Sequence, residues 1–370
     1  MIKERKKEGF TLIELLAVIV ILVVIALIAS PLIISIIEDS RKKAFENSVY
    51  GVMSTYDIKI AKEGNYKGII YNFPEGNNEL KYSGTKMSGG SIFLTPSGSI
   101  EVRELTDGRY CANGNKTNLI IKRGDCSIDL ATAPVIKEAF INGNNFLGSG
   151  ITKNDVESLF FVMVSDFPEG SVDISDKGNG SVMIWSKDEN SNGKLEVYIG
   201  AIDDFVYANP ISRYLFEKFN HLSVLDLNNF NTVTTTNMNL MFRETGYLSG
   251  NFTLKIGDHF DTSNVTTMSG MFHGTGFSNQ RFRLNLGDKF DTKNVTDMGA
   301  IFYHTGRYSQ FFTLDLGDKF NVDKVTNYGN AFVDTGMANL SFKPTATVKT
   351  EAEKDAILAK FPNIVITIKP

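Results

Sequence analysis

The stretch TLKIGD at residues 253–258 decides the fold, because the chain repeats it. Residues 283–288 read RLNLGD and residues 313–318 read TLDLGD, so the three copies lie 30 residues apart without a gap. The same spacing relates the aromatic residues that follow the copies, which are Phe260, Phe290 and Phe320, and then Phe272, Phe302 and Phe332. Fixed-period self-similarity is the sequence pattern of a solenoid, in which each unit buries its apolar face on the next. We therefore predict a solenoid for this part of the chain.

Side chains are expected to alternate between the two faces of each repeated strand. The apolar positions Phe252, Leu254 and Ile256, with their equivalents 30 and 60 residues on, are predicted to point inward. The polar positions between them are predicted to point outward and to form the candidate ligand face, which comprises Lys255, Arg283, Asn285 and Asp315, with Thr253 and Thr313 beside them. Their mixed chemistry encodes no class of ligand. For each single residue, a merely solvated surface is the alternative interpretation.

The repeated region extends over residues 223–343, with about four units of 30 residues, the first of which is the most divergent. Behind it, residues 344–370 are predicted to form a C-terminal cap. Thr350 and Glu353 fit a capping box at the start of a helix that should end near residue 360. A terminal unit of distinct character is what a solenoid requires.

The repeats resemble the BspA-type leucine-rich repeats of bacterial surface proteins. The residues that carry the resemblance are FDTSNVT at 260–266, followed by Met268 and by Met271 with Phe272. Residues 131–222, which we interpret as a linker and the N-terminal part of the repeat domain, contain short stretches similar to the segment that often opens such arrays. The resemblance implies a leucine-rich-repeat-like fold, although the period is above the usual range of roughly 20–29 residues.

The N-terminal 40 residues differ in composition from the rest of the chain. A basic cluster at residues 3–8 precedes fifteen consecutive apolar residues at 15–29, and the segment stays mainly apolar to residue 37. A membrane-spanning helix needs about 20 predominantly apolar residues, so this segment can span. The basic cluster predicts a single pass with the N-terminus in the cytoplasm. A signal peptide or a plain signal anchor is the alternative, and neither accounts for Glu14 in the apolar segment.

The segment GFTLIELL at residues 9–16 resembles the prepilin leader of type IV pilins and type II secretion pseudopilins. In that family a prepilin peptidase cuts after the Gly and methylates the new N-terminal Phe. The resemblance implies a leader of residues 1–9 and cleavage between Gly9 and Phe10. The processed chain would then begin at Phe10, whose amino group stays cationic after methylation.

Two further residues acquire roles through this resemblance. Glu14 is the fifth residue of the processed chain, where it can neutralise the amino group of a neighbouring subunit during assembly. Pro31 is the twenty-second, and because it removes a backbone hydrogen bond the helix can loosen there when subunits pack into a filament. The family's plan of one long helix on a small antiparallel sheet implies an α+β pilin domain over residues 10–130, with the helix at 10–63.

The local patterns agree with this plan. Apolar residues recur at steps of three and four between Phe45 and Ile60, which is helical periodicity. Farther along, two β-prone runs at residues 91–94 and 99–102 flank the turn sequence Thr-Pro-Ser-Gly, which is typical of a hairpin. A third strand is expected at residues 119–122.

The chain has two cysteines, Cys111 and Cys126. In an exported chain a single pair is most simply a disulfide, and many pilins have a disulfide-closed loop at the corresponding place late in the pilin domain. Closing a loop of this length would contribute about 3 kcal/mol in the chain-entropy model. A reactive thiol or a metal-binding pair is the competing interpretation, although no His neighbours either Cys in the sequence.

Composition and motifs narrow the function further. The chain of 370 residues has 38 basic and 42 acidic residues and a net charge of −4, so no basic excess indicates nucleic acid as a partner. The motif that begins at Asp188 lacks the acidic residue of a calcium loop, and a hairpin turn is the better interpretation. The sequence carries no recognisable enzyme, cofactor or metal motif, so we expect a protein that is not an enzyme and has no cofactor.

These observations predict a processed, exported pilin-like subunit. It would lie in the cytoplasmic membrane before assembly and on a cell-surface pilus afterwards. The repeat domain would serve adhesion or binding to a host or matrix macromolecule, and its bulk favours a minor or tip subunit. The partners would be the prepilin peptidase, other pilin subunits and the cytoplasmic membrane. The alternatives are a pseudopilin of a type II secretion or DNA-uptake apparatus, and a membrane-tethered surface repeat protein that never polymerises.

Overall fold

The structure is a computed structural model that describes residues 12–63, 70–124, 126, 130–139, 147 and 151–368, with the side chains of the first helix described from residue 36 on. The chain divides into two compact units. The first comprises Met1–Leu94 and Ser99–Ser127, and the second comprises Thr95–Gly98 and Ile128–Pro370.

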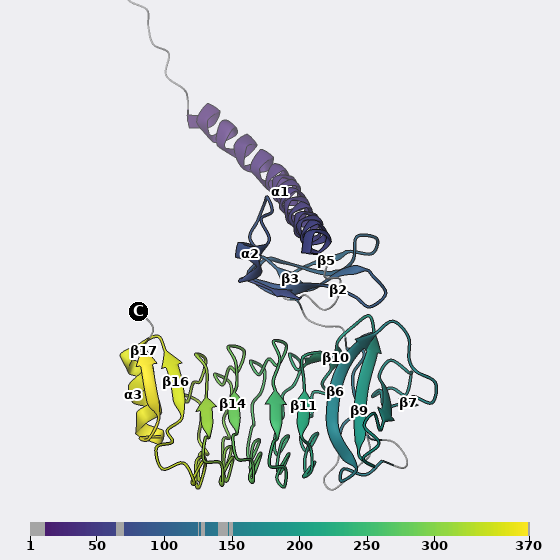
Figure 1. The fold of residues 1–370 in the computed structure, drawn as a ribbon. Helices are drawn as coiled ribbons and strands as arrows, with labels where there is room; N and C mark the ends of the chain where they lie inside the picture. Colours follow the sequence, from purple (N-terminus) through teal and green to yellow (C-terminus); the bar gives the residue numbers. More distant parts are fainter. Residues whose placement is uncertain are drawn as a thin grey trace, which may run out of the picture. The chain divides into compact units, whose positions relative to one another are not determined.

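The first unit combines one long helix with a five-stranded sheet (Figure 1). Its elements are α1 (Leu12–Glu63), β1 (Tyr71–Asn72), α2 (Gly76–Glu79), β2 (Gly89–Leu94), β3 (Ile100–Thr106), β4 (Tyr110–Gly114) and β5 (Ile120–Arg123). The strands follow one another in the sheet in chain order, and every neighbouring pair is antiparallel. The predicted hairpin of β2 and β3 and the predicted strand β5 are therefore confirmed.

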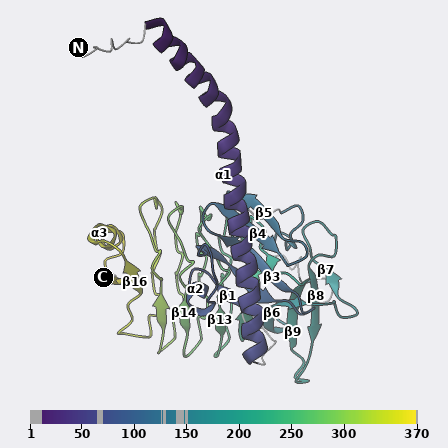
Figure 2. The same cartoon turned by 90° about the horizontal axis from the view of Figure 1, so that it is seen from above.

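The C-terminal half of α1 packs against this sheet, and its N-terminal half extends beyond the sheet (Figure 2). The helical residues Val49, Val52 and Tyr56 are fully buried, as their spacing of three and four predicts. They pack in one core with sheet residues such as Ile92 and Val102. An amphipathic outer half of the helix thus gains its stability from tertiary packing.

The predicted membrane span lies in the N-terminal half of α1. The residues whose side chains the structure describes include no helix with the length and hydropathy of a membrane span. The predicted span depends on the apolar residues 15–29. Their side chains are not among those that the structure describes.

The second unit consists almost entirely of short strands and turns. Its elements are β6 (Val156–Val164), β7 (Val172–Asp173), β8 (Met183–Lys187), β9 (Leu195–Ile202), β10 (Val206–Tyr207), β11 (Val224–Asp226), β12 (Phe230–Asn231), β13 (Thr253–Lys255), β14 (Arg283–Asn285), β15 (Thr313–Asp315), β16 (Thr345–Val348), α3 (Glu351–Lys360) and β17 (Val365–Ile368). The antiparallel hairpin of β8 and β9 confirms the turn predicted in place of a calcium loop.

The 30-residue repeats lie side by side as parallel turns, which we call the repeat stack (residues 223–343; Figure 1). Strands β11 and β13 pair in parallel, as do β14 and β15. A second row of parallel bridges joins residues exactly one period apart, from Thr267 to Asp297 and on to Asn327. Within described residues 151–350 the structure contains no helix, so the repeat stack is built from strands and turns.

Stacked aromatic rings fill the core of the repeat stack. Phe242, Phe272 and Phe302 occupy the same position in successive repeats, and their ring centroids lie 5.1 and 5.4 Å apart. Threonine side chains form a parallel ladder, in which Thr275 Oγ1 donates to the carbonyl of Phe242 and Thr305 Oγ1 to that of Phe272. A period of 30 therefore places equivalent residues on one another, and each hydroxyl of this ladder finds its acceptor in the preceding repeat.

The C-terminal cap follows the predicted plan. Thr350 is the N-cap of α3, and its side chain accepts a hydrogen bond from the backbone of Glu353, whose carboxylate accepts one from the Thr350 backbone in return. This reciprocal arrangement is the capping box that the sequence predicted. Strands β16 and β17 pair in parallel and extend the sheet of β14 and β15.

Candidate binding face of the repeat unit

One row of side chains crosses five neighbouring strands of the second unit. The strand pairing places Trp185 of β8 opposite Tyr198 of β9, and Tyr198 opposite Phe160 of β6. Phe160 lies opposite Asp226 of β11, which lies opposite Lys255 of β13. Paired residues point to the same face of a sheet, so these five side chains form one row, which we call the outward row.

The 30-residue period places Asn285 and Asp315 at the positions equivalent to Lys255 in the later repeats, whose strands form a separate sheet. Asn285 of β14 lies opposite Asp315 of β15, and Asp315 lies opposite Thr345 of β16. The strands alternate as predicted, because Leu254 and Leu284 are buried while their neighbours Lys255 and Asn285 are exposed. The prediction that Lys255, Asn285 and Asp315 point outward is thereby confirmed, and Arg283 is exposed on the same face.

The aromatic end of the outward row is a stack of three half-buried rings. The centroids of Phe160 and Tyr198 are 5.3 Å apart, and those of Tyr198 and Trp185 are 5.8 Å apart, with nearly parallel planes. Lys187 places its ammonium 5.8 Å from the Tyr198 ring. A Cβ atom at Gly200 would lie 2.8 Å from the Trp185 indole, so the absence of a side chain there leaves room for the ring.

The middle of the row is an ion pair. Lys255 Nζ lies 2.9 Å from Asp226 Oδ2, and the Asp226 side chain is only 14% exposed. The Asp226 carboxylate is thus shielded between Phe160 and Lys255. Because the Lys255 side chain is half exposed, the pair is a surface ion pair that contributes about 0–1 kcal/mol to stability, and its main effect is to fix both side chains on this face.

Two of the predicted ligand-face residues also have a local structural role. The Asn285 side chain accepts a hydrogen bond of 2.9 Å from the backbone of Gly287, and the Asp315 side chain accepts one of 3.0 Å from Gly317. Each closes the turn that follows its own strand, as short polar side chains do. Arg283 differs from them, because it forms no ion pair with any described residue.

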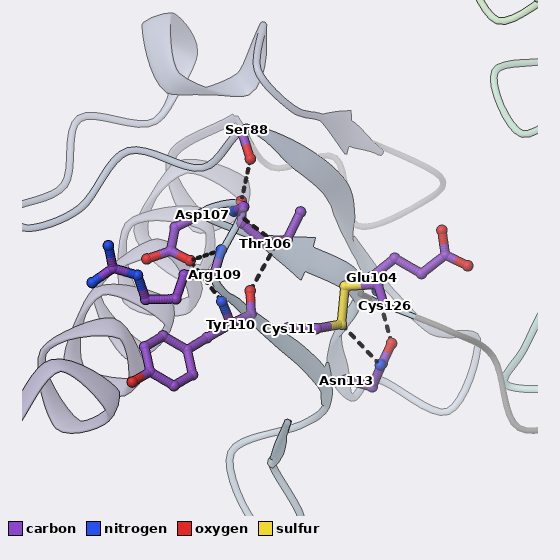
Figure 3. Close-up of a disulfide and its surroundings, with 10 residues drawn as sticks. Ser88, Glu104, Thr106, Asp107, Arg109, Tyr110, Cys111, Asn113 and Cys126 are labelled. Atoms are coloured by element: carbon purple, nitrogen blue, oxygen red, sulfur yellow. Dashed lines mark hydrogen bonds between the residues drawn. A yellow bond between two sulfur atoms is a disulfide. The ribbon is translucent and has the colours of Figure 1, made fainter. Parts of the chain in front are cut away.

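The disulfide belongs to the first unit, where the structure joins Cys111 of β4 to Cys126 (Figure 3). Asn113 lies beside it, and its side chain donates to Cys111 Sγ at 3.6 Å and accepts from the backbone of Glu104 at 2.7 Å. Asp107 accepts from the backbone of Tyr110 and so closes the turn between β3 and β4. The sulfur bridge therefore joins β4, whose preceding turn is fixed by Asp107, to the segment that follows β5.

The processing and assembly residues lie outside the part whose side chains are described. Gly9 and Phe10 precede the first described residue, and Glu14 and Pro31 belong to α1 upstream of residue 36. Their predicted roles therefore stay predictions that depend on the sequence.

Three histidines lie in the repeat stack, and two of them meet. The rings of His273 and His304 have centroids 6.1 Å apart, and His304 Nε2 lies 3.2 Å from Asp334 Oδ2. Burial lowers the pKa of both imidazoles, and the neighbouring Arg307 lowers that of His304 further. The described residues contain no group of three or more His, Cys, Asp or Glu side chains that could hold a metal ion.

Sequence reasoning missed the aromatic half of the outward row. The signal was present, because the alternation of buried Leu159 and Phe161 leaves Phe160 on the opposite face. What the sequence lacks is the strand order, since residues 160, 185 and 198 become neighbours only through the pairing of β6, β9 and β8.

The comparisons with known proteins match two parts of the chain. Residues 5–30 match the family described as the prokaryotic N-terminal methylation motif. Residues 212–343 match the family described as Mycoplasma protein of unknown function, DUF285. No curated protein and no solved structure matches the chain. The methylation motif indicates a type IV pilin-like or pseudopilin-like protein, which is consistent with processing by a prepilin peptidase and with insertion into a membrane before display at the surface.

Proposed function

We propose that this chain is a minor or tip pilin that carries a leucine-rich-repeat-like solenoid for adhesion or macromolecular binding at the cell surface. The single observation that carries the proposal is the methylation motif at residues 5–30. The first unit is a pilin domain in this proposal, and the second unit is its payload. The chain acts by binding rather than by catalysis.

The physics of the N-terminal segment supports assembly into a filament. Cleavage after Gly9 leaves a cationic amino group on Phe10, and the Glu14 carboxylate of a neighbouring subunit can neutralise it in the apolar filament core. A carboxylate without such a partner would cost a few kcal/mol in that environment. Glu14 also lies near the positive end of its own helix.

The outward row supports a binding role for the second unit. Aromatic rings, an ion pair and polar side chains follow one another across the face, from Trp185 to Asp315. Aromatic residues and arginine are the residue types that dominate the energetics of binding surfaces. The ligand in this proposal is a host or matrix macromolecule that lies across the strands.

The first experiment tests processing and assembly together. The intact mass of the chain is measured in a sheared surface-filament fraction. The expected mass is that of residues 10–370 plus one methyl group and minus two hydrogens for the Cys111–Cys126 bond. A full-length mass found only in the membrane fraction would leave a tethered repeat protein instead.

Substitution of Glu14 separates a filament subunit from a tethered protein. The change Glu14→Ala should abolish incorporation into filaments while the chain still accumulates in the membrane, and Glu14→Asp, which keeps the charge, is the matched control. Equal incorporation of the wild-type and Glu14→Ala chains would contradict the assembly role. Short filaments confined to the envelope would favour the pseudopilin alternative.

Adhesion is tested on the assembled filament. The double change Trp185→Ala with Tyr198→Ala should reduce adherence of filament-bearing cells to immobilised extracellular matrix, because it removes the aromatic end of the outward row. Tyr308→Ala is the matched control, since that ring is 57% exposed and lies outside the outward row. Equal adherence of all three strains, at equal filament number, would remove the row from the proposal.

A further inference from the structure

A cavity of about 420 Å³ lies between the last repeat and the C-terminal cap. One side is formed by residues of the last repeat, among them Tyr328 and Phe332, and the other by the end of α3, including Lys360 and Phe361. In Figure 1 this is the end of the repeat stack where α3, β16 and β17 gather. The cavity lies wholly within the second unit and apart from the outward row.

The cavity lies where the last repeat departs from the pattern of the others. Two buried columns of the repeat stack hold methionine or isoleucine, in one case Met268 and Met298 and in the other Met271 and Ile301, all completely buried. Thirty residues after Met298 the chain has Tyr328, which is 40% exposed, and thirty residues after Ile301 it has Ala331. The change to Ala331 removes side-chain volume at this place, and Tyr328 forms part of the cavity wall.

Aromatic rings enclose this space. Phe361 meets Phe332 edge to face at 5.1 Å between centroids, and it meets Tyr328 in the same way at 5.7 Å. Phe342 and Pro344 also belong to the apolar lining. A concave, mostly apolar site of about 300–1,000 Å³ with a few polar groups is the usual form of a small-ligand site.

Lys360 is the only charged residue among those that line the cavity. Its ammonium donates two hydrogen bonds to backbone carbonyls, at 2.8 Å to Val322 and at 2.6 Å to Val325. An ammonium group has three hydrogens, so one donor is left over after these two bonds. Lys360 has no ion pair with a carboxylate among the described residues, and it lies 5.6 Å from the Tyr328 ring.

We propose that this cavity binds an apolar, preferably aromatic, group that carries a single carboxylate. The apolar body would replace the missing methionine side chain of the repeat pattern, and the carboxylate would accept the third hydrogen bond of Lys360. A charged acceptor matches an unpaired cation, and charge-assisted hydrogen bonds are roughly twice as strong as neutral ones. The group can belong to a free small acid or to the C-terminal residue of a polypeptide. This inference is independent of the proposed filament function.

The test is a calorimetric titration of the full chain in detergent micelles with 3-phenylpropionate. Its uncharged analogue, 3-phenylpropanamide, is the chemical control. We expect the acid to bind about tenfold more tightly than the amide, which corresponds to the difference between a charged and a neutral hydrogen bond. The source is distinguished by two pentapeptides that end in Phe, one with a free carboxylate and one amidated. Tighter binding of the free-acid peptide than of 3-phenylpropionate assigns the site to chain termini, and the reverse order assigns it to small acids.

Two variants make the result specific. Ala331→Met restores the residue type of Met271 and occupies the part of the cavity beside residue 331, so it should weaken binding about tenfold or more while the thermal midpoint stays equal or rises. Lys360→Met keeps the apolar stem and should remove the preference for acid over amide. The proposal is overturned if the acid shows no saturable binding, or if the Ala331→Met chain in the same micelles binds it as tightly as the wild type does.

Discussion

Among single residues, His259 carries the clearest consequence for stability. Its side chain is 7% exposed, and its ring lies 4.2 Å from that of Phe205. The Nε2 atom has no hydrogen-bond partner among the described residues. Burial, with the nearby Lys289 as a second cause, lowers the pKa of His259 from 6.5 to about 3. The imidazole is therefore neutral in the folded protein at every physiological pH.

This burial predicts an acid-sensitive repeat unit. The unfolded chain takes up the proton near pH 6.5 and the folded chain does not, so the stabilisation is complete above that pH and is lost as the pH falls toward 3. Between pH 7 and pH 5 the free energy of unfolding should decrease by about 2 kcal/mol from this residue. Urea titrations at both pH values measure the difference. His259→Gln should flatten it, and an unchanged pH dependence in that variant would assign the effect to other groups.

For the outward row, the sequence predicts the direction of the side chains but not their partners on other strands. The outward direction of Lys255, Asn285 and Asp315 follows from alternation within one repeat, and the structure confirms it. That Asn285 and Asp315 also close their own turns follows from the glycines two residues on, a local signal that sequence reasoning left unused. The ion pair of Lys255 with Asp226 joins two different repeats, so it depends on the register between strands rather than on local pattern.

At the scale of elements, the hairpin of β4 and β5 holds the long helix on its sheet. The Tyr110 ring stacks on Phe45 of α1 at 5.8 Å, and the Tyr110 hydroxyl donates to the Glu38 carbonyl. Arg123 at the end of β5 lies 2.7 Å from the Glu38 carboxylate. The bond between Cys111 and Cys126 closes this hairpin, with the two cysteines 15 residues apart. The disulfide thus stabilises the surface that positions α1.

Removing the disulfide should destabilise the first unit by about 3 kcal/mol, because the unfolded chain regains the freedom of a loop of about 15 residues. The double change Cys111→Ser with Cys126→Ser is measured by urea unfolding, with amide hydrogen exchange in β3 and β4 as the probe of this unit. The wild-type chain in reductant is the matched control and should behave like the variant. The prediction fails if oxidised and reduced chains unfold at the same urea concentration.

Local sequence patterns predicted the helices and strands better than the packing between them. The capping box of Thr350 and Glu353 and the helical spacing from Phe45 to Ile60 are short-range patterns, and both are confirmed. The cavity beside Lys360 was not predicted, although Tyr328 and Ala331 visibly break the repeat. Whether a broken pattern leaves space depends on how the cap packs against the last repeat, and a single sequence does not contain that information.

At the scale of the whole molecule, the repeat stack is quasi-one-dimensional. Each repeat contacts its neighbours through bonds that recur one period on, as in the backbone bonds from Thr296 to Thr266 and from Thr326 to Thr296. The aromatic column of Phe242, Phe272 and Phe302 has the same regularity. The stability of such a stack is close to a sum of unit and interface terms, so units can be removed without loss of the others.

Deletion of one complete period should therefore leave a folded protein. Removing residues 254–283 joins Thr253 to Leu284, which preserves the alternation of the strand and sets each remaining column in register. We expect a cooperative unfolding transition, the same circular-dichroism signature per residue, and a free energy of unfolding lower by about 2–4 kcal/mol.

The matched control is the deletion of residues 254–268, which is half a period. It removes fewer residues, yet it places buried positions such as Phe282 and Leu284 out of register with Phe252 and its strand, so inward side chains would meet turns instead of the aromatic column. This shorter deletion should abolish the cooperative transition. If both deletions unfolded alike, the repeats would not act as separable units, and the additive description of the repeat stack would be wrong. If the full-period deletion alone stays folded, the period itself, rather than chain length, determines the stability of the repeat stack.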